Sequence, residues 1–176
     1  KAFETDKVSP FGGIVIVNKP LDLETAREID KIFTEIILAP GFQDGVAEYL
    51  SQKKNRRLVN ILKFPTAETS LKIKSIFGGA ALQEADSGMI TASDLKTVTS
   101  RKPTEAELTD LLFAWRVVKH VKSNAIVYAK NRQTCGIGTG QTSRVDSSEI
   151  AVGKATKENL SLKGSVVASD AFFPFS

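Results

Sequence analysis

The residues with the clearest chemical pattern lie in the run CGIGTGQTSR, from Cys135 to Arg144. Its three alternate glycines let the backbone come close to a ligand, and Ser143 can cap the helix that follows. Arg144 offers a planar pair of donors to a phosphate or a carboxylate. The run is not a Walker A loop, and it departs from the dinucleotide-binding loop because Gln141 replaces the last glycine. The pattern fits an anion site and a glycine-rich turn with a solvent-facing Arg equally well.

Two further groups carry reactive side chains, and each has a simpler structural explanation. Lys119 and His120 could exchange a proton, because imidazole titrates near neutral pH. Both residues also fit the basic last turn of a helix, which is the interpretation we favour. Cys135 could be a nucleophile, but we favour a buried thiol. With one Cys and one His, the sequence predicts no internal disulfide and no metal centre.

The run SDAFFPFS places Phe172, Phe173 and Phe175 around Pro174, shortly after Asp170. Exposed together, these rings would form an apolar surface patch. We therefore expect them either to pack in a core or to line a site for a flat ring, beside a carboxylate.

Alternating strand and helix patterns must position these residues. Runs rich in β-branched residues at 12–18, 35–41 and 56–62 are typical of buried strands. Helical spacing of apolar residues follows the first strand, after the N-cap Asp22, and also follows the second strand. This order predicts an α/β fold with parallel strands and right-handed crossovers.

The rest of the chain predicts a hairpin followed by a second α/β region. Residues 72–86 have strand composition with a bend at Gly78–Gly79. Thr104 and Glu107 form a capping box at the start of a helix. The sequence then predicts strands over 124–131 and 133–140, a helix over about 143–160, and a strand over 164–170. The polar stretch that ends at Pro103 is the expected boundary between one half, residues 1–100, and another, residues 101–176.

Composition excludes several classes of protein. The 176 residues are 41% hydrophobic and 25% charged, which are ordinary globular values. The basic residues that give the net charge of +4 are scattered, so we expect no nucleic-acid partner, and we interpret the dense run KKNRR (53–57) as a solvated loop or helix end. No apolar run is long enough for a membrane helix, and the cytoplasm is the default location for such a chain.

Five strings, taken in order, resemble one family. They are SPFGGIVIVN, EIILAPGF, KSNAIVYAKN, TCGIGTGQTSRVDS and SLKGSVVASDAFFPF. Together they resemble the transformylase domain of the bifunctional purine biosynthesis family AICAR transformylase/IMP cyclohydrolase, over almost the whole chain. The resemblance implies a layered α-β-α fold with two cytidine-deaminase-like halves and no zinc. It implies transfer of a formyl group from 10-formyltetrahydrofolate to AICAR, giving formyl-AICAR, in a homodimer with its sites at the subunit interface.

The resemblance also implies roles for residues within the matching strings. Asn124 falls at the position of an Asn beside the reacting amine, which is a catalytic position in the family. The positions that match substrate-binding residues are Phe11, Gly12, Glu35, Arg144 and Phe172. Those that match folate-binding residues are Val145 and Pro174.

The departures from the family pattern limit what the chain can do. The family's catalytic Lys-His pair lies in a KH-x-x-P-x-G motif, whereas Lys119-His120 is followed by Val-Lys-Ser-Asn. Because these 176 residues lack that motif, we expect this chain alone to be inactive as a formyltransferase. The IMP cyclohydrolase domain of the family is also absent from them. The alternative is a non-catalytic α/β module that binds an anion or nucleotide.

Overall fold

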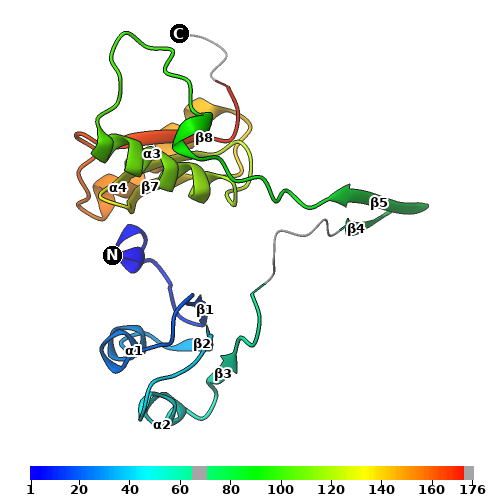
Figure 1. Cartoon of the computed structure of the whole chain (residues 1–176), viewed down its shortest axis with the longest axis vertical. Coiled ribbons are helices and arrows are strands. Elements are labelled where there is room, and N and C mark those ends of the chain that lie inside the picture. The colour runs from blue at the N-terminus through cyan, green and yellow to red at the C-terminus, as the bar shows by residue number, and fades with distance from the viewer. Residues whose placement is uncertain (65–70, 173–176) are drawn as a thin grey trace. The chain divides into compact units, whose positions relative to one another are not determined.

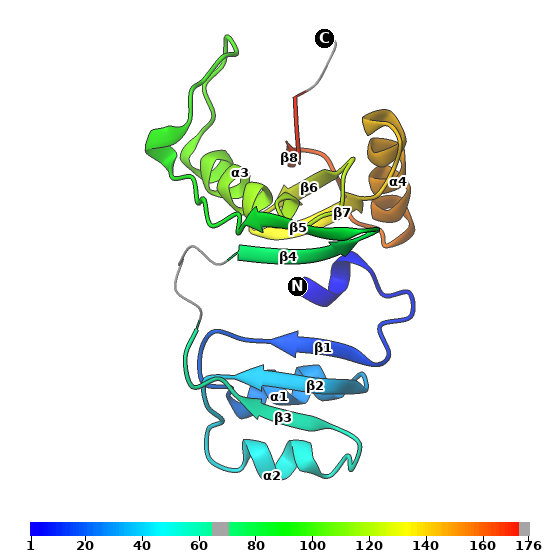
Figure 2. The same cartoon turned by 90° about the vertical axis from the view of Figure 1, so that its right-hand side faces the viewer.

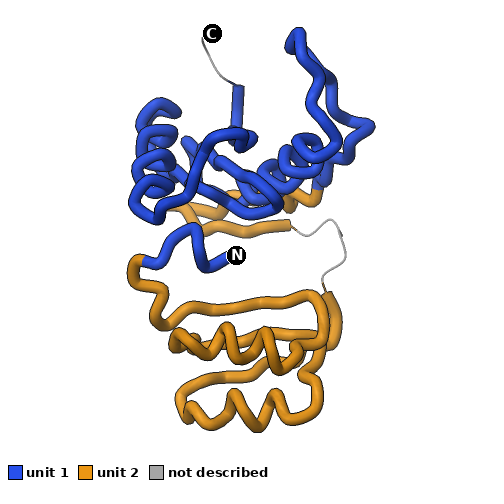
Figure 3. The backbone as a smooth tube through the Cα atoms, turned by 90° about the vertical axis from the view of Figure 1, so that its left-hand side faces the viewer, with its two compact units in different colours: residues 1–7, 88–176 blue, residues 8–87 orange. Residues whose placement is uncertain are grey.

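The computed structural model describes residues 1–64 and 71–172 (Figure 1). The chain divides into two compact units, one formed by residues 8–87 and the other by residues 1–7 and 88–176 (Figure 3). The predicted α/β class is confirmed. The cytidine-deaminase-like halves, and the division of a transformylase domain at residue 100, stay predictions.

In the unit of residues 8–87, strands and helices alternate as expected. The elements are β1 (Gly13–Ile16), α1 (Leu23–Asp30), β2 (Thr34–Ala39), α2 (Val46–Ser51) and β3 (Arg57–Asn60). The strands form a parallel sheet in the order β1-β2-β3 (Figure 2), which confirms the predicted parallel arrangement. Asp22 caps α1 by accepting a hydrogen bond from the Thr25 amide at 2.7 Å, as the sequence indicates.

One face of this sheet carries the core of the unit. Leu21, which precedes α1, and buried side chains from β2 and both helices form a single cluster: Leu21, Ala26, Ile37, Ala39, Val46 and Leu50. Residues on the other face of β1 stay exposed, with Ile14 at 65% and Ile16 at 63%. Within this unit, therefore, the helices cover one side of the parallel sheet.

Arg56 corrects the prediction that the KKNRR run is solvated. Its side chain is fully buried and donates to Asp30 Oδ1 at 2.6 Å and to the Thr34 carbonyl at 3.2 Å. Lys53 adds a second ion pair to Asp30 at 2.9 Å. Burial alone would raise the pKa of Asp30, but the hydrogen bonds and charges of Lys53 and Arg56 outweigh it and lower that pKa. The basic run thus anchors the end of α1 to the start of β3.

The predicted hairpin is also present. β4 (Leu71–Ile76) and β5 (Gly79–Glu84) pair antiparallel, and Ile76 lies opposite Gly79. Gly78 sits in the turn between them with φ of +78°, a backbone conformation that suits glycine.

The other unit contains the second predicted series of elements. These are the short 3-10 helices η1 (Ala2–Thr5) and η2 (Ala92–Asp94), the helices α3 (Glu105–Val118) and α4 (Arg144–Lys157), and the strands β6 (Ile126–Lys130), β7 (Gln133–Gly138) and β8 (Val166–Ser169). The strands form an antiparallel sheet in the order β7-β6-β8. The capping box of α3 is confirmed, because Thr104 and Glu107 bond each other's backbone amides.

The two long helices lie on opposite faces of this sheet. Val127 and Ala129 of β6 belong to the core cluster that includes Ala114 and Val118 of α3. The intervening Tyr128 points the other way, and its hydroxyl lies 2.8 Å from Ser148 Oγ on α4. Successive strand residues face opposite sides, so this unit has three layers: helix, sheet and helix.

Candidate functional site

The predicted glycine loop leads from β7 into the amino-terminal end of α4. Ser143 caps the helix as expected, since its hydroxyl accepts from the Asp146 amide at 3.1 Å. The loop is also tied to the segment before β6. The Gly140 amide and the Thr139 hydroxyl donate to the Lys122 carbonyl at 2.8 and 3.1 Å. The amino end of α4 is therefore held against the start of β6.

Two of the three glycines have a different role from the one their pattern suggested. A Cβ on Gly138 would lie 1.7 Å from the Ser147 carbonyl oxygen, and one on Gly136 would lie 2.3 Å from that of Ala151. Both glycines thus allow β7 to approach α4 closely. Gly140, with φ of +67° and open space around it, is the one that shapes the loop.

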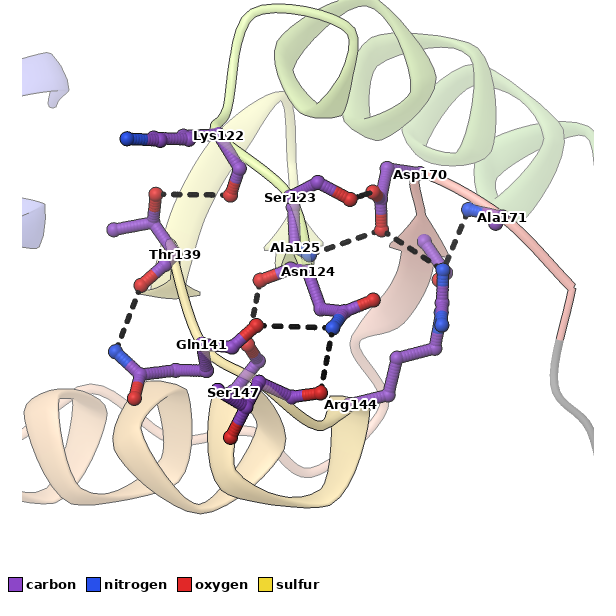
Figure 4. Close-up of polar contacts among 12 residues, drawn as sticks. Lys122, Ser123, Asn124, Ala125, Thr139, Gln141, Arg144, Ser147, Asp170 and Ala171 are labelled. Atoms are coloured by element: carbon purple, nitrogen blue, oxygen red, sulfur yellow. Dashed lines mark hydrogen bonds and ion pairs between the residues drawn. The ribbon is translucent and has the colours of Figure 1, made fainter.

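Asn124 is fixed in one orientation by this loop (Figure 4). Its Nδ2 donates to the carbonyls of Gln141 at 2.9 Å and Thr142 at 3.0 Å. Its own carbonyl accepts from Ser147 Oγ at 2.6 Å. Both amide hydrogens are used, and Oδ1 has no partner among the described residues. The side chain therefore presents an acceptor, which suits a ligand that offers an N–H group.

Arg144, the first residue of α4, is restrained by the end of β8. Its Nε donates to Ser169 Oγ at 3.2 Å, and its Nη2 lies 3.5 Å from Asp170 Oδ1. The two charged side chains are only 21% and 17% exposed. Nη1 has no partner within residues 1–64 and 71–172, so it remains a donor for a phosphate or carboxylate.

A second group of predicted residues lies in the unit of residues 8–87. The Gly12 amide donates to the Phe33 carbonyl at 2.9 Å, and a Cβ on Gly12 would lie 3.4 Å from Glu35 Oε1. Phe11 is 75% exposed, and its ring centroid lies 4.9 Å from that of Phe33. The structure thus brings Gly12 close to Glu35 and leaves the Phe11 ring accessible.

A family model described as AICARFT/IMPCHase bienzyme matches residues 1–154. The chain belongs to this family.

Curated relatives are identical to this chain at more than half of the aligned positions. The protein named bifunctional purine biosynthesis protein PurH of Chlorobaculum parvum is 56% identical over 176 residues, which is the whole of this chain and 34% of the relative. The protein of the same name from Chloroflexus aurantiacus is 52% identical over 175 residues, covering 99% of this chain and 34% of the relative. The chain spans about a third of the length of these relatives.

The remaining family-derived residues lie at the surface or outside the described part. Val145, next to Arg144 in the first turn of α4, is 66% exposed, and Phe172 is 78% exposed. Pro174 lies outside the described residues. The structure brings Asn124 and Arg144 to the same end of α4. The catalytic role of Asn124 and the substrate-binding roles of Arg144, Phe11, Gly12 and Glu35 stay predictions for this AICARFT/IMPCHase family member.

Sequence reasoning missed three residues that organise this end of α4. Ser147 and Ser123 are small polar residues that belong to no motif. Asp170 was considered only as a carboxylate near the phenylalanines. Asp170 follows β8 directly and lies beside Ala125, because β8 pairs antiparallel with β6. A strand pattern that ends in Asp was a usable signal, but the pairing partner of that strand was not visible in the sequence.

Cys135 is a buried thiol, and Lys119 and His120 lie at the end of a helix, as the favoured interpretations of the sequence state. Cys135 is 6% exposed, and burial is the main reason that the pKa of its thiol is raised. Lys119 and His120 directly follow α3, and Lys119 Nζ donates to the Gly88 carbonyl at 2.7 Å. The contact between Lys119 Nζ and Gly88 lies away from the hydrogen bonds at the amino end of α4.

Two features are absent from the residues that the structure describes. No helix among them is long and apolar enough to span a bilayer. Within the same residues, no cluster of three or more His, Cys, Asp or Glu side chains could hold a metal ion.

Proposed function

We propose that this chain supplies part of a site at which a formyl group passes from 10-formyltetrahydrofolate to the 5-amino group of AICAR, giving formyl-AICAR. Membership in the AICARFT/IMPCHase bienzyme family supports the proposal. The observation that carries it is the pairing of a fixed amide acceptor, Asn124 Oδ1, with a restrained guanidinium donor, Arg144, at one helix end.

The proposed reaction needs an acceptor beside the amine. The amine of AICAR is a poor nucleophile because its ring withdraws the nitrogen lone pair. As this nitrogen forms its bond to the formyl carbon, it must lose a proton, and the bond from that carbon to N10 of the folate breaks as N10 receives a proton. Asn124 Oδ1 would accept a hydrogen bond from the amine and orient it, since both Nδ2 hydrogens are engaged elsewhere.

The proposed binding residues contact different parts of the two ligands. Arg144 Nη1 would bind an anionic group of the nucleotide, and Phe172 would lie against its rings. In the unit of residues 8–87, Phe11 and Gly12 match positions that line a pocket in the family, and Glu35 would accept from the carboxamide of the base. Val145 and Pro174 would contact the folate, which we treat as a co-substrate.

We further propose that the protein works in the cytoplasm as a homodimer with sites at the subunit interface. Exposed apolar side chains on β1, Ile14 and Ile16, support a partner surface in the unit of residues 8–87, because such patches mark interaction sites. We place the IMP cyclohydrolase activity named in the family outside these 176 residues.

A binding measurement with the 176-residue chain tests the proposed function. Arg144→Ala removes a charge-assisted hydrogen bond, for which about 1.5–3 kcal/mol is typical, so the Kd for AICAR nucleotide should rise about 10-fold or more in isothermal titration calorimetry. The matched control is Arg116→Ala, which removes the same charge from an exposed position in the last turn of α3. Equal affinities for Arg144→Ala and the wild type would contradict the assignment of the pocket.

A further inference from the structure

Asp170 connects the two groups on which the proposed function depends. Its Oδ2 accepts from Ser123 Oγ, and its Oδ1 accepts from the Ala125 amide at 2.9 Å. These two donors flank Asn124 in the sequence. The same Oδ1 lies 3.5 Å from Arg144 Nη2 (Figure 4). One carboxylate therefore contacts the Ser123 side chain before Asn124 and the Ala125 backbone amide after it, and it restrains the guanidinium of Arg144.

The strand pairing explains why Asp170 can make these contacts. In the antiparallel pair of β6 and β8, Ile126 lies opposite Ser169. Ala125, just before β6, and Asp170, just after β8, therefore come together. The Asp170 amide donates to the Ala125 carbonyl at 3.4 Å, while its carboxylate accepts from the Ala125 amide. Ser169, the preceding residue, supplies the hydroxyl that accepts from Arg144 Nε at 3.2 Å.

The carboxylate is also ionised at neutral pH. Burial alone would raise the pKa of Asp170, but the hydrogen bonds from Ser123 and Ala125 and the charge of Arg144 outweigh burial and hold that pKa below its usual value. Both oxygens already accept hydrogen bonds, and the side chain is 17% exposed. The carboxylate of Asp170 thus accepts hydrogen bonds from neighbouring protein groups rather than from a ligand.

We infer that Asp170 is a positioning residue of the proposed formyl-transfer site, which holds the neighbours of Asn124 and the Arg144 guanidinium in place together without touching the substrate. This inference rests on the proposed function for the identity of the ligand. The arrangement of the three side chains does not depend on that ligand, and so it can be tested separately.

The first test is spectroscopic and needs no ligand. In ¹H–¹⁵N spectra of the 176-residue chain, Asp170→Asn should shift both the Arg144 Nε–H and the Asn124 side-chain amide resonances. The matched control Glu149→Gln neutralises an exposed carboxylate of α4 and should leave both in place. Circular dichroism establishes that each variant is folded. If Asp170→Asn unfolds the chain, Ser123→Ala removes one of the contacts and should shift the Asn124 signal. Unshifted signals in the folded variants would overturn the inference.

The second test measures binding of AICAR nucleotide by calorimetry. Asp170→Asn should weaken binding about 10-fold, because a guanidinium that is free to reorient loses its advantage over a flexible cation. In the Arg144→Ala background, Asp170→Asn should weaken binding by a smaller factor, because part of its effect depends on the Arg144 side chain. Tighter binding by Asp170→Asn, or fully additive effects, would overturn the positioning role. A wild-type chain that binds no AICAR would count against the proposed function alone, and the spectra would still decide the role of Asp170.

Discussion

At the scale of single residues, the glycine-rich run shows how one pattern can serve packing and a site at once. Gly136 and Gly138 have no room for a side chain because the backbone of α4 lies against them. That close approach also lets Ser147 Oγ reach the Asn124 carbonyl at 2.6 Å. The glycines therefore act on the candidate site indirectly, by setting the distance between β7 and α4.

A methyl group at position 138 should be strongly destabilising. In Gly138→Ala the new Cβ would lie 1.7 Å from the Ser147 carbonyl oxygen, so strand and helix must separate. We expect a loss of about 3 kcal/mol in the free energy of unfolding, at the upper end of typical overpacking costs. The matched control is Gly153→Ala within α4, where nothing lies within 4 Å. It should gain up to about 1 kcal/mol from helix propensity. Denaturant titration of both variants checks this, and a neutral Gly138→Ala would contradict the close packing.

At the scale of secondary-structure elements, a buried ion pair joins α1 to β3. Arg56 is fully buried, and Asp30, at the last position of α1, is its charged partner at 2.6 Å. Removing Arg56 leaves Asp30 with Lys53 as its cation. Arg56→Ala should therefore cost about 3 kcal/mol, whereas the exposed neighbour substitution Arg57→Ala should change stability by no more than about 0.5 kcal/mol.

The pH dependence of this loss has a definite sign. The pKa of Asp30 is lowered in the folded protein, so its ion pairs stabilise the fold above the unfolded-state pKa, about 4. That stabilisation is lost as the pH falls through the lowered folded-state pKa. The stability difference between the wild type and Arg56→Ala should thus shrink below about pH 4. Urea titrations between pH 3 and 7 measure it, and a pH-independent difference would show that Arg56 acts through packing alone.

The elements themselves could be predicted because their signals are local. Asp22, Thr104 and Ser143 each precede an apolar helical pattern, and each caps the helix that the structure contains. The burial of Arg56 and the position of Asp170 could not be predicted in the same way. Both depend on which strands become neighbours, and a single sequence does not reveal this pairing. Asn124 was identified through family resemblance and Arg144 already from the glycine-rich run, but the network that they share depends on the antiparallel order of the sheet.

At the scale of the whole molecule, the 176 residues fold as two compact units and span about a third of their curated relatives. Asn124 and Arg144 belong to one unit, and Gly12 and Glu35 belong to the other. Each unit thus carries a part of the residue set that the proposed function requires. The proposed reaction also needs a general base, and this requirement determines what the chain can do by itself.

The chain alone should bind AICAR nucleotide without catalysing formyl transfer. Loss of the amine proton requires a general base, and the amide of Asn124 accepts hydrogen bonds but is not basic enough to take that proton. The single histidine, His120, follows α3, and no hydrogen bond among the described residues joins its side chain to the network at the amino end of α4. Mass spectrometry for formyl-AICAR, with the Chlorobaculum parvum relative as positive control, should detect no product above the uncatalysed background. Turnover near that of the control would mean that these 176 residues contain a base that neither the KH-x-x-P-x-G motif nor the described geometry reveals.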